Sequence, residues 1–351
     1  MKKYFFRSIV VCCSLMMLVA CEHRELSDPN TGHYLRVYLN EEIKNVTCGF
    51  YDENLKRPEY TRPSVLRAVL ADPESGRIVS ERYLQNQGQD ERGYYIDGYI
   101  GAEAGTYNLL VYNFGSATTL IRNEQDYYKM QAYTDAVSER FLQYLPTSRH
   151  DIDESSIVYE PEHLFHDVGE PITIPKTNKV DTLRNEAGDF FTAHSVVLSY
   201  YLQIRIKGIE WVTSAVSLLS GMAEGAVLHE HHRINEMRPV NLFFDMNYTK
   251  LQRTGEGGSV ATLYATFNTF GKLPDEETIY TLNFEFIKTD GSSQVEKLDI
   301  TPMFDTPMVK NQQWILLEHE IVITPPPGAE TTGGMTPGVD EWGEVETEIE
   351  L

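Results

Sequence analysis

The densest cluster of potential metal ligands in the sequence is His229-Glu230-His231-His232-Arg233. A zinc-protease helix carries two histidines four residues apart, with a glutamate between them as the base. The fourth residue after His229 is Arg233, so the cluster does not fit that motif. On a strand, His229 and His231 would share one face and could bind a metal, but the sequence offers no evident third ligand. We therefore favour a hairpin loop that carries His229, His231 and His232 over a metal site.

Two further groups resemble ligand sets. His163 and His166 stand three residues apart, without a helical pattern or other ligands around them. Counted from Asp151, a calcium loop would need a glutamate at the twelfth place, and Glu162 stands there. The sixth place needs a glycine for its sharp turn, but Ser156 occupies it. We predict structural roles for both histidines and a chance match for the loop.

The motifs that identify common enzyme classes are missing from the sequence. There is no Gly-x-Ser-x-Gly nucleophile motif, no phosphate-binding loop and no dinucleotide fingerprint. Pairs of carboxylates do not identify an active site in a chain with 52 acidic residues, because such pairs occur throughout it. We predict that the protein is not an enzyme and has no catalytic residues, cofactor or metal site. Some of the 21 tyrosines could stack on sugars, which leaves glycan binding as an alternative, although most should pack within sheets.

Cys21 is the one residue with a clear chemical assignment. Three basic residues precede an apolar run from Ile9 to Ala20, which is too short to span a bilayer as a helix. Leu18-Val19-Ala20-Cys21 then has the form of the bacterial lipoprotein processing motif. The Cys21 sulfur would carry diacylglycerol by a thioether, and cleavage before Cys21 would free an amine for a further acyl chain such as palmitate. At ~0.8 kcal/mol per buried CH₂, two or more chains anchor a protein stably.

This assignment predicts a lipoprotein signal peptide over residues 1–20 and a mature protein whose partner is the membrane, reached through the lipid on Cys21. The body would face either the periplasm or the outside. Only Cys48 remains as a second cysteine, and we expect it to be buried in a strand.

Composition limits the other partners. The formal net charge is -22, which argues against nucleic acid and against direct adhesion to anionic lipid, because both need basic patches. Removal of residues 1–20 leaves about 330 residues, enough for two domains.

The elements that must carry these residues are strands. Leu35, Val37 and Leu39 alternate with polar or aromatic residues, which predicts a half-buried strand. Similar alternation covers 198–206, 261–267 and 280–286, with turn residues between the runs. The pattern predicts antiparallel β-sandwiches and an all-β protein. Met130, Val137, Phe141 and Tyr144 recur at roughly helical spacing, which predicts at most one short helix within 124–145.

Turn-rich and polar stretches divide the chain. We predict a lipidated tether over 21–32, an N-terminal β-sandwich domain over 33–180 and a C-terminal one over 190–325. Residues 326–351 are expected to form a Pro/Gly linker and a final edge strand, in which Glu344, Glu346, Glu348 and Glu350 alternate with aliphatic residues.

Several segments in order give the chain a family resemblance. The segments are Ala104–Asn113, Pro161–Asp167, Tyr200–Ala223, Ala265–Gly271 and Gly333–Glu346. With them the chain resembles the Bacteroidetes-type lipoproteins of unknown function that are related to the fimbrial anchor subunits of the fimbrillin superfamily, including minor fimbrium anchoring subunits.

The resemblance implies two tandem transthyretin-like β-sandwich domains on an outer-membrane lipid anchor. It also implies a non-catalytic role as a fimbrial anchor or minor assembly subunit, with fimbrial subunit proteins as partners. Binding would proceed by strand addition to a sheet edge or groove. A surface glycan-binding lipoprotein is the alternative function.

Overall fold

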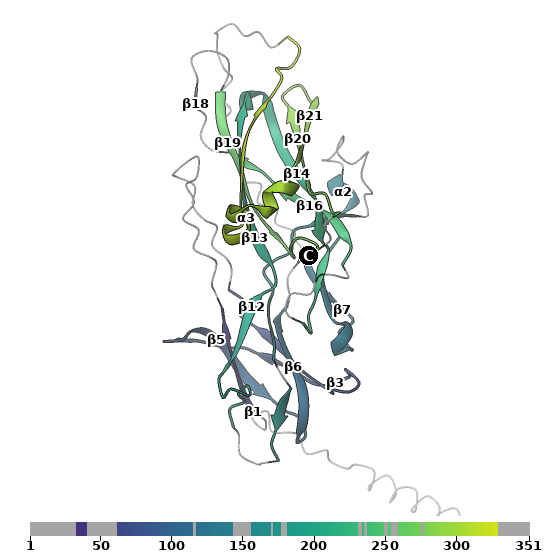
Figure 1. Ribbon diagram of the computed structural model, residues 1–351, viewed down its shortest axis with the longest axis vertical. Coiled ribbons are helices and arrows are strands. Elements are labelled where there is room, and N and C mark those ends of the chain that lie inside the picture. The colour runs from purple at the N-terminus through teal and green to yellow at the C-terminus, as the bar shows by residue number, and fades with distance from the viewer. Residues whose placement is uncertain are drawn as a thin grey trace, which may run out of the picture.

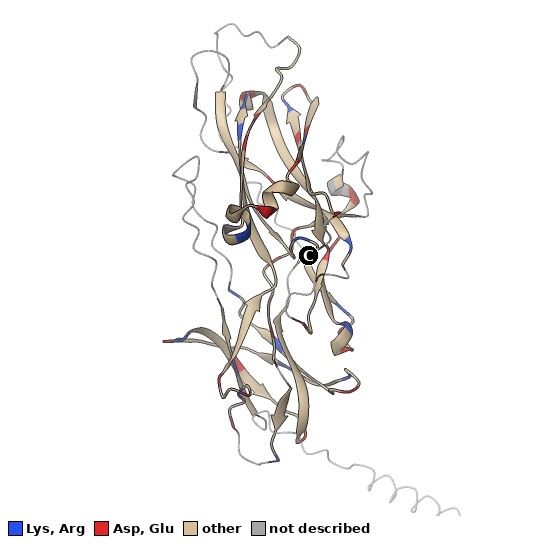
Figure 2. Cartoon of the chain, in the orientation of Figure 1, with Lys and Arg blue, Asp and Glu red and all other residues tan. Residues whose placement is uncertain are grey.

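The chain folds into an elongated, almost entirely β-structured molecule (Figure 1). The computed structural model describes residues 33–40, 62–114, 117–142, 156–169, 171–176, 181–230, 234, 237–248, 252–253, 259–274 and 277–328. The predicted all-β fold class is confirmed. Basic and acidic residues are interspersed along the length of the molecule (Figure 2). Among the described residues, no helix is long and apolar enough to cross a membrane.

A nine-stranded sheet forms the part of the molecule drawn lowest in Figure 1. Its order is β3-β2-β6-β10-β12-β1-β5-β4, with β11 paired to β6. The strands are β1 (His33–Leu39), β2 (Leu66–Ala71), β3 (Ile78–Leu84), β4 (Asn86–Asp90), β5 (Gly93–Ile100), β6 (Gly105–Asn113), β10 (Phe165–Val168), β11 (Ile172–Ile174) and β12 (Phe191–Ser195).

This sheet folds over on itself into a sandwich. Only Gln85 separates β3 from β4, so one bent strand passes from the layer of β2 to the layer of β5. Where the layers meet, a Cβ on Gly98 would lie 3.3 Å from the Cα of Leu84, so the backbones approach closely at this glycine. The core between the layers includes Leu35, Val37 and Leu39, which confirms the predicted alternation in the first strand.

Two five-stranded sheets pack face to face in the upper part of Figure 1. One contains β13 (Leu198–Lys207), β17 (Asn247–Tyr248), β18 (Gln252–Arg253), β19 (Ser259–Thr269) and β22 (Trp314–Val322). The other contains β9 (Ile157–Tyr159), β14 (Val212–Ala223), β16 (Pro239–Asp245), β20 (Thr281–Lys288) and β21 (Ser293–Asp299). Their shared core is rich in aromatic rings, such as Phe244 stacked on Phe267 with centroids 4.4 Å apart.

A small three-stranded sheet lies between the two sandwiches. It contains β7 (Thr119–Arg122), β8 (Gln131–Thr134) and β15 (Gly225–Val227). One apolar cluster joins it to both neighbours, because Leu110 and Tyr112 of β6 pack with Ala226 of β15 and with Phe270 beyond β19. The junction is therefore a packed core, and we infer that the molecule behaves as one rod.

The helix prediction was wrong in most of its range. Within 124–145 the structure has a 3₁₀ turn η1 (Tyr127–Lys129), strand β8 and only a four-residue helix α2 (Glu139–Leu142). Met130 is buried because it enters the junction core next to β8, not because it lies on a helix face. A second short helix, α3 (Pro307–Gln312), exceeds the predicted maximum of one; Thr306 caps it by accepting a hydrogen bond from the Val309 N–H. The other 3₁₀ turns are η4 (Ile209–Trp211) and η5 (Thr301–Asp305).

The sheets are not purely antiparallel. Parallel pairing joins β1 to β12, β13 to β22 and β9 to β16. Through these pairs β9 joins the upper sandwich, although it precedes residue 180, and β12 joins the lower one, although it follows residue 190. We propose that the chain divides into two domains at residues 180–190, and that each domain contributes one strand, β9 or β12, to the sandwich of the other. The predicted signal peptide, Cys21, the tether, Cys48 and the final edge strand lie outside the described residues.

Candidate functional site

The predicted histidine cluster is only partly described, because residues 231–233 lie outside the described part. His229 Nε2 lies 3.2 Å from Glu230 Oε1. Its ring packs against Tyr127 and Tyr128, with centroids 5.8 and 5.6 Å away. Within the described ranges, no group of three or more His, Cys, Asp or Glu side chains could hold a metal ion. The contacts of His229 in the described part of the chain are thus with Glu230 and with the aromatic rings of η1.

The structure separates the other predicted ligand sets. His163 Nε2 lies 3.5 Å from Ser199 Oγ, and burial lowers the pKa of this histidine. His166 is buried and its Nδ1 lies 3.3 Å from the Leu228 carbonyl oxygen. The Glu162 carboxylate accepts a hydrogen bond from the Thr118 N–H at 3.3 Å. These contacts are structural and join the two sandwiches to the junction. Asp151, the first residue of the possible calcium loop, lies outside the described residues.

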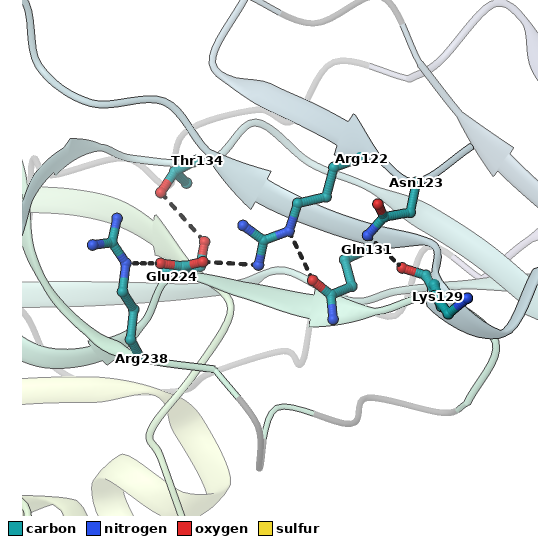
Figure 3. Close-up of polar contacts among 7 residues, drawn as sticks. All are labelled: Arg122, Asn123, Lys129, Gln131, Thr134, Glu224 and Arg238. Carbon is teal, nitrogen blue, oxygen red and sulfur yellow. Dashed lines mark hydrogen bonds and ion pairs between the residues drawn. The ribbon is translucent and has the colours of Figure 1, made fainter. Parts of the chain in front are cut away.

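A buried carboxylate in the junction forms a connected polar site. Glu224 lies between β14 and β15, and its side chain is 9% exposed. Arg122 at the end of β7 donates from Nη2 to Glu224 Oε1 at 2.9 Å. Arg238, just before β16, donates from Nε to Oε2 of the same carboxylate (Figure 3). Two guanidinium groups thus neutralise one buried charge, as such a charge requires.

Backbone hydrogen bonds also hold Glu224 in place. The Glu224 carbonyl accepts a hydrogen bond from the Thr134 N–H at 3.0 Å, and the Glu224 N–H donates to the Arg238 carbonyl at 3.1 Å. A Cβ on Gly225 would lie 2.1 Å from the Ala132 carbonyl oxygen. The close approach of β15 to β8 therefore requires glycine at this position. This site holds three distant segments together.

A second polar group covers the outer face of β1 and β5. The register pairs Tyr34 with Tyr99, Arg36 with Asp97, and Tyr38 with Tyr95. Arg36 binds Asp97 at 3.0 Å, and its Cζ lies 3.8 Å from the centroid of the Tyr95 ring. Tyr38 is buried, whereas Tyr99 is 36% exposed. Most of these rings are therefore used in packing, as the sequence predicted for the tyrosines in general.

Sequence reasoning missed the site around Glu224. Arg122 and Glu224 are 102 residues apart, and no local motif marks either of them. The one available signal was Gly225 at the end of a strand-like run, because an isolated glycine in a strand often marks close backbone approach.

Comparisons with known proteins support the predicted resemblance. Residues 71–245, which include β3 to β16, match the family described as "Domain of unknown function (DUF5119)". The chain is 24% identical to the "Putative fimbrium anchoring subunit Fim4B" of Bacteroides ovatus ATCC 8483 over 371 aligned positions, which cover 98% of this chain and 97% of the relative.

A solved structure shares the fold. The crystal structure described as a "putative adhesin" from Bacteroides ovatus ATCC 8483 superposes with a TM-score of 0.54. It is 19% identical, and the match covers 88% of this chain and 98% of that structure. Residues 71–245 thus match the family described as a domain of unknown function, DUF5119, and the chain is similar along nearly its whole length to a relative described as a putative fimbrium anchoring subunit.

Proposed function

We propose that the protein is a non-catalytic outer-membrane lipoprotein that anchors fimbriae or helps to assemble them. The similarity to a fimbrium anchoring subunit over 98% of this chain carries the proposal. The partners would be the membrane, through lipid on Cys21, and fimbrial subunit proteins.

The direction of the strands supports an orientation for this role. β1 begins at the lower end of the molecule in Figure 1, and β12 runs parallel to it. β12 continues through Val196 and Val197 into β13, and β22 runs parallel to β13 toward the opposite end. Cys21 stands twelve residues before His33, a stretch that spans at most about 40 Å. A lipid on Cys21 would thus hold the nine-stranded sandwich near the membrane, with the other sandwich directed away.

The outer sandwich offers sheet edges for binding by strand addition. Among the described residues, β21 and β22 are edge strands of its two sheets. The Gln294 side chain of β21 bridges them at the outer end, because Nε2 donates to the Val322 carbonyl at 2.9 Å and Oε1 accepts from the Thr324 N–H at 3.0 Å. The Gln294 amide thus bonds backbone groups of β22 and of the residues after it that a neighbouring strand could otherwise bond. We propose that a partner strand adds at this end of the sandwich.

Two experiments test the proposal. Labelling of cells with an alkyne analogue of palmitate should modify the wild-type protein but not Cys21→Ser, and Cys21→Ser should leave the membrane fraction. Purified protein should bind fimbriae sheared from the same bacterium, and binding should protect amides of β21 or β22 from hydrogen exchange. Retention of unlabelled Cys21→Ser in the membrane would contradict the lipid anchor, and absence of fimbrial binding would contradict the fimbrial role.

Glycan binding is the alternative function. It calls for several exposed aromatic rings on one face, and on the β1–β5 face Tyr99 is exposed while Arg36 covers the Tyr95 ring. Binding to a glycan array that disappears in Tyr99→Ala, without binding to fimbriae, would favour this alternative.

A further inference from the structure

Strand β1 is held along both of its edges. On one side, β5 pairs with it from His33–Ile100 to Tyr38–Tyr95 in antiparallel register. On the other side, β12 pairs with it in parallel, with Val37 opposite Phe191 and Leu39 opposite Ala193. Near the start of β1, the segment 181–183 adds two hydrogen bonds of 2.8 Å to the backbone of Tyr34. Release of β1 therefore requires the loss of hydrogen bonds on both edges.

Side chains fix β1 on both faces as well. Leu35 and Val37 are fully buried in the core of the nine-stranded sandwich. On the outer face, Arg36 binds Asp97, and the Tyr38 hydroxyl donates to Asp90 Oδ2 at 2.7 Å. Displacement of β1 along its axis would expose the apolar side chains and break these polar contacts together.

The chain path determines how a pull on the N-terminus would load these contacts. β1 starts at the lower end of the molecule, while its parallel neighbour β12 leads upward into β13 of the other sandwich (Figure 1). A force between the two ends pulls parallel strands β1 and β12 in opposite directions along their axes. Hydrogen bonds between strands lie across this direction, so they share the load and do not open one at a time.

We propose that β1 is a mechanical clamp, whose function is to carry tension from the lipid anchor into the outer sandwich through β12 and β13. This inference rests on the proposed attachment through Cys21, because only a tether at the N-terminus loads β1 in this direction. The lower sandwich then has a specific purpose: it converts a pull on a membrane tether into shear across β1.

Single-molecule pulling on the mature chain tests the clamp. One handle is attached at the N-terminus and the other at position 194, where His194 is exposed on β12. The first rupture should release β1 and the chain up to β2, a gain in length on the order of 100 Å. The double variant Tyr34→Cys/Tyr99→Cys places a disulfide across the β1–β5 pair, on the outer face. When oxidised, it should abolish this first event or raise its force at least about twofold, because a covalent bond then shares the load.

A matched disulfide provides the control. The hydroxyl oxygens of Thr106 and Thr173 are 3.3 Å apart on an exposed surface. Thr106→Cys/Thr173→Cys links β6 and β11 outside the path of the force. It should leave the first rupture unchanged, and reduction of either variant in the same sample should restore wild-type behaviour. A first rupture that does not release β1, or an equal effect of both disulfides, would overturn the clamp. Loss of fimbrial binding in the separate assay would overturn the proposed function and leave the force measurement standing.

Discussion

Arg122 and Glu224 form an ion pair of 2.9 Å across 102 residues of sequence, and the pair lies where the two sandwiches meet. Arg122 belongs to β7, which follows β6 of the nine-stranded sandwich, whereas Glu224 follows β14 of the other sandwich. The apolar junction core surrounds the same region. Polar and apolar contacts thus act together to align the sandwiches, as a subunit that transmits force along its length would need.

Removal of this carboxylate should weaken the junction. Glu224→Ala leaves Arg122 and Arg238 without their acceptor, and we expect a loss of about 1–2 kcal/mol in the free energy of unfolding, since both guanidinium groups reach solvent. Urea unfolding followed by circular dichroism measures the change. Glu91→Ala, in the exposed turn between β4 and β5, is the control and should change stability by less than about 0.5 kcal/mol. Equal effects of the two variants would show that the ion pair contributes nothing.

Gly225 should tolerate no side chain. The Cβ of Gly225→Ala would lie 2.1 Å from the Ala132 carbonyl oxygen, so β15 must move away from β8. We expect a loss of at least about 2 kcal/mol, typical of overpacking against backbone. Gly169→Ala is the matched control, because its Cβ would meet only Phe191 at an ordinary 3.6 Å. Thermal unfolding of the two variants compares them, and a wild-type melting temperature for Gly225→Ala would contradict the described pairing.

Glu160 should make stability depend on pH. Burial raises the pKa of Glu160 above its usual 4.5, and the nearby carboxylate of Asp245 adds to the increase, although the Asn268 N–H bond opposes it. The folded protein therefore holds this proton more tightly than the unfolded chain, so the contribution of Glu160 to stability falls as pH rises from 4.5 through the raised pKa.

Glu160→Gln removes this ionisation and can still accept the Asn268 bond. The variant should be more stable than the wild type near pH 7, and the difference should shrink toward about pH 4. Denaturant titrations across this range measure the difference, with the exposed Glu162→Gln as the neighbouring control. A constant difference at all pH values would mean that Glu160 is not the titrating group.

The sequence predicted those elements whose pattern depends on local burial. The first strand is an example, since Leu35 and Val37 are buried and Tyr34 and Arg36 face outward, as alternation required. The two sandwiches also follow from short strands separated by turns. The lipidation of Cys21 stays a prediction, which rests on a contiguous processing motif.

Pairing between distant segments could not be predicted. Met130 and Val137 have helical spacing, but strand β8 between them pairs with β15 more than 90 residues away, and that contact decides the conformation. Glu224 has no local feature that distinguishes it from the other acidic residues of the chain. Its role arises only when Arg122 and Arg238 converge on it in the folded protein.

The most direct measurement for the central claim is the retention of fimbriae on cells that carry Cys21→Ser in place of the wild-type protein. Fimbriae in the culture medium and on the cells would be quantified by immunoblot, with Cys48→Ser as the matched cysteine control. A lipid anchor on Cys21 predicts that Cys21→Ser releases both the protein and the fimbriae into the medium, whereas Cys48→Ser leaves both on the cells. Fimbriae that remain fully attached to Cys21→Ser cells would contradict it.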